Sequence, residues 1–268
     1  MSRINERLTE AKARGGGFIP FVTAGDPDLG TSLSILLKLA EMGADVIELG
    51  VPFTDPMADG PTIQRSSQRA LEAGTTLRSV LELAREFRRQ SDIPLVFFSY
   101  FNPILRFGLT DFENAACEAG IDGLLLTDVI EDEAAAISQR LAAKKIDLIS
   151  LVAPTTTDER LGTICAAARG FLYAVSRAGV TGAREESSFA AQILVKRARR
   201  FTDLPIAVGF GISTPEQIAE VWQYADAAVV GSAIVDVIGS AAAGGIAVSK
   251  VERFVGSLLP QVAKTGRE

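Results

Sequence analysis

Two hydrophobic patterns alternate along the whole chain: short continuous apolar runs and longer stretches with helical periodicity. Short runs rich in Val, Ile, Leu and Phe are continuously apolar, which is typical of strands covered on both faces, as in a parallel sheet. Longer stretches with helical periodicity separate them. The predicted strands cover 18–23, 45–49, 94–98, 123–127, 147–152, 171–175, 205–208 and 227–230. The predicted helices cover 31–42, 76–89, 158–168, 188–200 and 214–224, with others beginning near 111 and 131 and a helical stretch after the last strand.

Eight strand–helix units in 268 residues predict a closed (β/α)₈ barrel. A doubly wound open sheet is the alternative. No linker or low-complexity tract divides the chain, so we expect a single barrel domain over 1–268. Ahead of the first strand, the sequence predicts a short amphipathic helix with Ile4, Leu8 and Ala11 on one face.

Composition excludes several classes of protein. The net charge of −6 disfavours wholesale binding to nucleic acid or to anionic membranes. No run of about 18 apolar residues predicts a membrane span, and the N-terminus lacks the apolar core of a signal peptide. The two cysteines, Cys117 and Cys165, lie in Ala-rich helical stretches, where we expect buried thiols and a cytoplasmic setting. The basic run at 196–200 is expected to be a solvated helix face.

The chain contains no histidine, so the usual proton shuttle and the commonest metal ligand are both missing. Acid–base chemistry near neutral pH must then fall to carboxylates, tyrosines or lysines. None of the seven lysines lies at the end of a predicted strand, which argues against a Schiff base. Two scattered cysteines argue against a catalytic metal. What remains is paired-carboxylate chemistry.

The segment VIELGVPFTDPMADGP at 46–61 carries the strongest candidates. Glu48 lies at the end of the second predicted strand, and Asp55 and Asp59 follow on a loop of turn residues. A carboxylate on a buried strand is costly unless it is compensated. Such a group, with others nearby, suits general acid–base catalysis. The alternative is a strand-end glutamate that pairs with its loop, followed by two aspartates that start turns.

Glycines mark the ends of the last two strands, in VGFGIS at 208–213 and VVGSA at 229–233. Glycine lets backbone amides approach an anion, and barrels often bind phosphate after strands seven and eight. Tight strand–helix turns are the alternative interpretation. The loop at 178–188 has the composition of a mobile lid, or of an ordinary surface loop.

With these residues in view, the chain resembles the tryptophan synthase α-subunit family over nearly its whole length. The motifs are FVTAGDPD at 21–28, ELGVPFTDPMADGPTIQ at 48–64, SRAGVTG at 176–182, VGFGIS at 208–213 and VVGSAIV at 229–235. The second motif is long and highly specific. The resemblance implies a (β/α)₈ barrel that cleaves indole-3-glycerol phosphate into indole and glyceraldehyde 3-phosphate.

The resemblance also implies roles for single residues. Glu48 is expected to help protonate C3 of the indole and to take the proton of the C3′ hydroxyl, while Asp59 accepts the indole N–H proton. Tyr173 would border the reaction centre, and Asp55 would pair with Thr181 when the lid closes. The implied phosphate residues are Gly182, Gly211, Gly231 and Ser232, and the implied walls of the indole pocket are Phe21, Tyr100, Leu126 and Phe210. Each wall residue has plain core packing as its alternative.

The family works with a β subunit that uses pyridoxal phosphate, so the resemblance implies an α₂β₂ tetramer and no cofactor or metal on this chain. The apolar segment 102–108 is the expected docking surface, with packing inside its own loop as the alternative. After the fourth strand, the run from Thr127 to Glu131 lacks a proline that many relatives carry soon after the aspartate at 128.

Other functions fit the sequence less well. Another cofactor-free barrel enzyme for a sugar phosphate is one alternative, but an indole-glycerol-phosphate synthase needs a lysine at a strand end. A barrel that only binds a ligand and regulates a β partner predicts a broken carboxylate pair, whereas Glu48 and Asp59 are both present. A free-standing indole-producing lyase is the remaining alternative.

Overall fold

The computed structural model describes residues 2–129, 131–175, 184–209, 211–241 and 244–259. Its strands form a closed barrel in sequence order, in which each strand pairs in parallel with the next and the last pairs with the first. The prediction of a (β/α)₈ barrel is therefore confirmed, and the open sheet is excluded. The strands are β1 (Gly17–Thr23), β2 (Ile47–Gly50), β3 (Leu95–Ser99), β4 (Gly123–Leu126), β5 (Asp147–Val152), β6 (Leu172–Val175), β7 (Ile206–Gly209) and β8 (Ala227–Val230).

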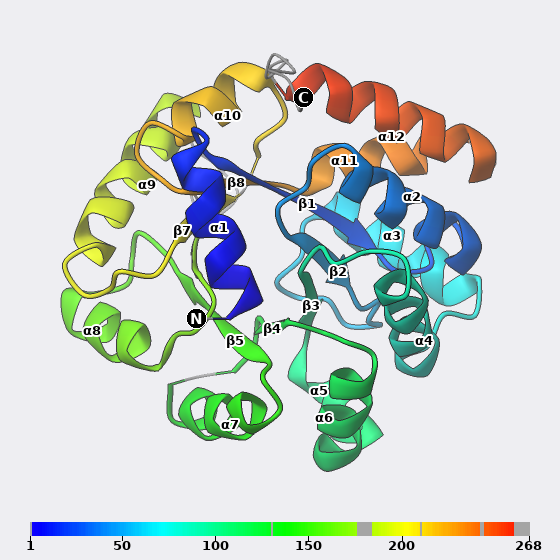
Figure 1. Ribbon diagram of the computed structural model, residues 1–268, viewed down its shortest axis with the longest axis horizontal. Helices are drawn as coiled ribbons and strands as arrows, with labels where there is room; N and C mark the ends of the chain where they lie inside the picture. Colours follow the sequence, from blue (N-terminus) through cyan, green and yellow to red (C-terminus); the bar gives the residue numbers. More distant parts are fainter. Residues whose placement is uncertain (1, 130, 176–183, 210, 242–243, 260–268) are drawn as a thin grey trace, which may run out of the picture.

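Helices surround the barrel (Figure 1) and cover the outward faces of the strands with apolar side chains. Many begin at a polar N-cap: Asp28, Thr76, Thr157 and Thr214 each accept a backbone N–H of the following first turn. The helices are α1 (Arg3–Ala13), α2 (Leu29–Glu41), α3 (Pro61–Glu72), α4 (Leu77–Arg88), α5 (Phe101–Phe107), α6 (Leu109–Glu118), α7 (Glu131–Ala143), α8 (Asp158–Ala167), α9 (Arg184–Ala198), α10 (Pro215–Val221), α11 (Ser232–Gly239) and α12 (Gly244–Leu258).

The first helix closes the N-terminal end of the barrel. Figure 1 shows α1 lying across the middle of the ring of strands. Its predicted apolar face is correct, because Ile4, Leu8 and Ala11 are fully buried. Ile4 and Leu8 join the cluster of side chains that fills the barrel interior. Burial of each such side chain stabilises the fold by about 1.5–3 kcal/mol.

Ion pairs reinforce this closure. Lys12 of α1 lies 2.9 Å from Asp226, which precedes β8, and Arg14, which follows the helix, lies 2.6 Å from Asp45, which precedes β2. Both aspartates are almost fully buried. Each also accepts a backbone N–H from a neighbouring strand segment. The end of the barrel that carries no active site in this fold class is thus held by both apolar and charged contacts.

Two helices were not predicted from the sequence. Helix α3 buries Ser66, Ser67 and Ala70, so its inner face is small and polar and the sequence shows no apolar periodicity there. Ser66 instead bonds to the Thr23 hydroxyl, 2.6 Å away. Helix α5 covers most of the segment predicted as an apolar loop, and its first backbone N–H donates to Asp128.

Two smaller expectations also need correction. Cys165 is buried as expected, but Cys117 is exposed on α6, because its position faces away from the barrel. The basic run at 196–200 is not merely solvated: Arg197 and Arg200 both pair with Asp158. These contacts join the C-terminal part of α9 to the start of α8.

Candidate active site

Strand β2 places Glu48 inside the barrel. In the parallel register Glu48 lies beside Phe21 of β1 and Val96 of β3. Its side chain is 1% exposed, and its Oε1 atom has no hydrogen-bond partner within the described residues. Burial raises the pKa of Glu48 from 4.5 to about 8. A carboxyl group with this pKa is mostly protonated at neutral pH and can act as a general acid.

The loop after β2 brings Asp59 to the same cavity. Burial raises its pKa from 3.8 to about 6, and a hydrogen bond with Tyr100 opposes that rise. The Tyr100 hydroxyl also accepts the backbone N–H of Ala58, with a donor–acceptor distance of 2.9 Å. Burial and the nearby charge of Asp59 raise the pKa of Tyr100 to about 12. Tyr100 is therefore a neutral donor that holds the loop and favours an ionised Asp59.

Glu48 and Asp59 line one cavity of about 400 Å³ at the C-terminal ends of the strands. Its walls are mainly apolar, and Phe21 and Phe98 meet edge to face with ring centroids 5.5 Å apart. Such a space suits a flat aromatic group with acid–base side chains at its edge. The lining residues are Phe21, Glu48, Ala58, Asp59, Gly60, Ile63, Phe98, Thr127, Leu151, Tyr173, Val175, Gly211, Val229, Gly231 and Ser232.

Tyr173 stands beside Glu48 on the cavity wall. It is 5% exposed, and burial, together with the charge of Glu48, raises its pKa well above 10. The absence of a side chain at Gly209 makes room for its ring, because a Cβ there would lie 2.1 Å from the Tyr173 hydroxyl oxygen. A neutral phenol therefore occupies a fixed position next to the buried acid.

One part of the cavity is built from backbone. Gly211 has a φ of 73°, which a side chain would strain, and Gly231 is the N-cap of α11. No side chain caps α11, and the Ile234 and Val235 amides donate to the Gly231 carbonyl, so the Ser232 and Ala233 amides are the ones that can face an anion. Ser232 is the first residue of this helix and also lines the cavity. This arrangement suits a phosphate group.

The other predicted site residues fall into three groups. Tyr100 contacts the catalytic loop through its hydroxyl and is not among the residues that line the cavity, and Leu126 packs in the core between strands and helices. Asp55 is exposed and accepts the Thr54 hydroxyl at 2.5 Å. The remaining three, Thr181, Gly182 and Phe210, lie outside the described residues. So does the part of the proposed lid at 178–183, whereas 184–188 form the start of α9.

Sequence reasoning missed several wall residues that strand alternation identifies. Successive inward-facing residues of a barrel strand are two positions apart. Val96, Ile149 and Ala227 fill the barrel interior. The residue two positions later on each strand should therefore also face inward and line the cavity. The residues found in this way are Phe98, Leu151 and Val229.

The described residues contain neither a candidate metal site nor a helix that could span a membrane. Within the described residues, no group of three or more Cys, Asp or Glu side chains is placed to hold a metal ion. Among the helices in the same part of the chain, none is both long enough and apolar enough to cross a membrane.

The fold and the cavity define a class of protein: an acid–base enzyme of the (β/α)₈ type, with two carboxyl groups beside an apolar pocket and a backbone site for an anion. Comparison with known sequences supports this class. Residues 8–261 match the family model described as tryptophan synthase alpha chain. The tryptophan synthase alpha chain of Acidiphilium cryptum is 50% identical over 238 residues, which are 88% of this chain and 86% of the relative. That of Caulobacter vibrioides is 49% identical over 242 residues, 90% of this chain and 88% of the relative.

Solved structures give the same answer. A chain of tryptophan synthase from M. tuberculosis superposes with a TM-score of 0.86 at 34% identity and covers 96% of this chain and 98% of that chain. A chain of the tryptophan synthase a2b2 complex from Pyrococcus furiosus gives 0.84 at 42% identity, with 91% and 97% covered. The chain belongs to the tryptophan synthase alpha chain family, as its motifs predicted. Members of this family are lyases of tryptophan biosynthesis that act on indole-3-glycerol phosphate.

Proposed function

We propose that this chain cleaves indole-3-glycerol phosphate with Glu48 as the general acid and Asp59 as its basic partner. The observation that carries the proposal is the separation of two carboxyl pKa values around one apolar cavity. Burial alone lifts the pKa of Glu48 to about 8, while the partly compensated Asp59 stays at about 6. At neutral pH Glu48 is therefore mainly protonated and Asp59 mainly ionised. The reaction needs one proton donor and one proton acceptor, and these two states provide them.

The reaction begins with a proton transfer from Glu48 to C3 of the indole ring. The ring nitrogen becomes electron-poor, and the Asp59 carboxylate accepts its N–H proton as the indolenine forms. The protonated C3 and the C=N bond of the indolenine make the ring an electron sink. The substrate supplies this electron sink itself, so the step requires no metal, no cofactor and no Schiff base with a lysine of the protein.

Carbon–carbon cleavage follows from the same two groups. The Glu48 carboxylate takes the proton of the C3′ hydroxyl, the C3′–O bond becomes the carbonyl of glyceraldehyde 3-phosphate, and the C3–C3′ bond breaks. Its electron pair returns through the ring to nitrogen, which recovers its proton from Asp59. Glu48 ends the cycle protonated, as it began, and no water is consumed.

The surrounding residues position the substrate. The Phe21 and Phe98 rings provide an apolar surface for the indole, and Tyr173 fills the space beside Glu48. The uncapped first turn of α11, with Gly211 and Gly231, supplies the amides for the phosphate. An anion there gains about 0.3–1 kcal/mol from the helix dipole in addition to its hydrogen bonds.

The proposed assembly is an α₂β₂ tetramer with a tryptophan synthase β subunit, as in the Pyrococcus furiosus complex. Two exposed apolar side chains support a docking surface at the catalytic end of the barrel. Met57 follows β2 and is 92% exposed, and Leu105 of α5 is 52% exposed. We expect pyridoxal phosphate on the β subunit only and place the reaction in the cytoplasm.

The experiment is the release of indole from indole-3-glycerol phosphate by the purified chain, first alone and then with a β subunit. The proposal predicts slow release alone and a sharp rise with β. Rapid release that β leaves unchanged would instead support a free-standing lyase. No release under either condition would refute the proposed reaction.

A further inference from the structure

The loop that carries Asp59 lies mostly on the surface of the protein. Met57, Ala58 and Gly60 are exposed, whereas Asp59 is only partly exposed. One hydrogen bond, from the Asp59 amide to the Pro56 carbonyl at 3.1 Å, closes a turn over 56–59. This bond shapes the turn but does not tie it to the barrel, so contacts from other segments must fix the position of the Asp59 carboxyl group.

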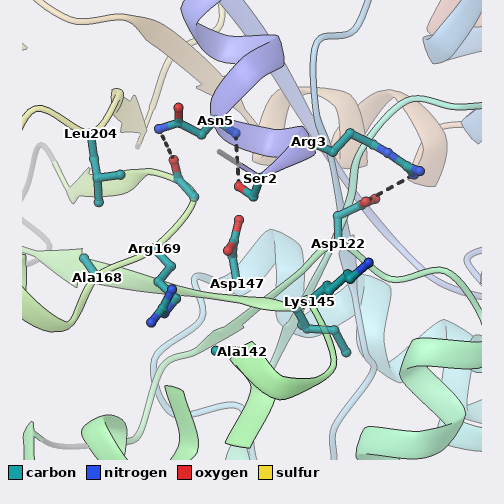
Figure 2. Close-up of a pocket in the computed structure, with 12 residues that line it drawn as sticks. Ser2, Arg3, Asn5, Asp122, Ala142, Lys145, Asp147, Ala168, Arg169 and Leu204 are labelled. Atoms are coloured by element: carbon teal, nitrogen blue, oxygen red, sulfur yellow. Dashed lines mark hydrogen bonds and ion pairs between the residues drawn. The ribbon is translucent and has the colours of Figure 1, made fainter. Parts of the chain in front are cut away.

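The opposite end of the barrel is held by a whole helix. Figure 2 shows the start of α1 beside a cavity of about 740 Å³ at that end. Arg3 pairs with Asp122 at 3.2 Å, and the Asn5 side-chain amide donates to the Gly170 carbonyl at 3.4 Å. Helix α1 therefore braces the segments that enter the strands there, whereas single side chains must do this for the loop of Asp59.

Two side chains bind the turn at 56–59 through hydrogen bonds within the described part of the chain. The Tyr100 hydroxyl accepts the Ala58 N–H at 2.9 Å. Gln64 of α3 donates its side-chain NH₂ group to the Asp59 carbonyl at 2.9 Å and, more weakly, to the Pro56 carbonyl at 3.5 Å. Gln64 therefore binds the backbone of the catalytic aspartate itself.

The side-chain amide of Gln64 is oriented by its two partners. Both are carbonyl oxygens, so the NH₂ group must face them. They belong to Pro56 and Asp59, the first and last residues of the turn. Gln64 is the fourth residue of α3, whose N-cap, Gly60, makes no side-chain hydrogen bond. A side chain of the helix thus holds the loop just before the helix begins.

We propose that Gln64 is a positioning residue for Asp59: its amide holds the turn at 56–59 so that the Asp59 carboxylate faces the indole N–H. The part that concerns indole rests on the proposed function, whereas the placement of Asp59 does not. The carbonyl carbon that Gln64 holds and the Asp59 side chain are attached to the same Cα, so a shift of one moves the other. Misplacement of a reacting group by about 1 Å can lower a rate by roughly 100-fold.

The first test compares Gln64→Met, which keeps the length of the side chain and loses the donor, with Gln68→Met. Gln68 lies one turn further along α3, is exposed and donates to Glu72 at 2.9 Å, so it is a matched control. Gln64→Met should lower kcat for indole release by about tenfold or more, with a smaller change in KM. Gln68→Met should behave like the wild type.

The second test needs no substrate. A ¹³C NMR titration of the carboxyl groups should give a pKa of about 6 for Asp59 in the wild type and a clearly lower value in Gln64→Met, because a released turn exposes this carboxyl group to water. The pKa of Glu48, about 8, should be the same in both proteins, since β2 does not move. A general loosening of the barrel would shift both carboxyl groups.

These outcomes separate the two proposals. A wild type that releases no indole would refute the proposed reaction, and the titration would still decide whether Gln64 places Asp59. The positioning role is overturned if Asp59 titrates at the same pH in the wild type and in Gln64→Met, or if Glu48 shifts together with Asp59. It is also overturned if Gln64→Met releases indole as fast as an active wild type.

Discussion

Substitution of Glu48 by Gln should make the protein nearly inactive and, at neutral pH, more stable. The variant keeps the size of the side chain but removes the transferable proton. Loss of a positioned general acid–base group lowers rates by roughly 10²- to 10⁴-fold. Because the cavity shape is preserved, substrate binding should change little, and the loss should fall on kcat.

The stability gain follows from the pKa of this carboxyl group. The unfolded chain releases the proton near pH 4.5, whereas the folded protein retains it up to about pH 8. Between these values the native state binds more protons than the unfolded state, so the free energy of unfolding falls as pH rises, by about 1.4 kcal/mol per unit. At pH 7 the accumulated penalty is on the order of 3 kcal/mol. The Gln side chain does not titrate, so the variant does not carry this pH-dependent penalty.

The assay is urea unfolding of the wild type and Glu48→Gln at pH 5, 6, 7 and 8. The stability difference in favour of the variant should widen steadily from pH 5 to pH 8. Glu82→Gln, on the exposed face of α4, is the matched control and should show a small difference that is the same at every pH. A difference between the wild type and Glu48→Gln that stays constant across this range would refute the assignment of a buried, protonated glutamate.

Three further substitutions test neighbouring parts of the account. Gly209→Ala places a Cβ 2.1 Å from the Tyr173 hydroxyl oxygen, so indole release should fall at least about tenfold, and adding Gly209→Ala to a Tyr173→Leu variant should cost almost nothing more. Tyr100→Phe removes the hydrogen bond that lowers the pKa of Asp59, so the acidic limb of the pH–rate profile should move upward by roughly one unit; an unmoved limb would contradict this role. Lys145→Gly relieves a left-handed backbone and should stabilise the protein by about 0.5–1 kcal/mol in urea unfolding; destabilisation would contradict the strain argument.

The sequence predicted the strands well because a parallel barrel buries them on both faces, and continuous apolar runs leave a clear signal. The first helix was equally clear, since Ile4, Leu8 and Ala11 have helical spacing and are all fully buried. Helix α3 was missed because its buried face consists of serines and an alanine. Its stability comes from tertiary hydrogen bonds, such as Ser66 to Thr23, which no local pattern contains.

In the candidate site, too, some residues could be predicted from the sequence, whereas others depend on tertiary contacts. Glu48 and Asp59 could be selected from chemistry, because carboxyl groups at the end of a buried strand are costly and the chain has no histidine. The position of Phe98 on the cavity wall could have been predicted from the alternation of inward-facing residues along β3. The hydrogen bond of the Tyr100 hydroxyl could not, because it depends on how the loop after β2 folds to present the Ala58 amide.

The measurement that tests the central claim most directly is the pH dependence of kcat/KM for indole release from indole-3-glycerol phosphate. An ionised Asp59 and a protonated Glu48 predict a bell-shaped profile, with a rising limb near pH 6 and a falling limb near pH 8. A rate that stays flat from pH 5 to pH 9, or that keeps rising above pH 8, would contradict the assignment of these two carboxyl groups as acid and base.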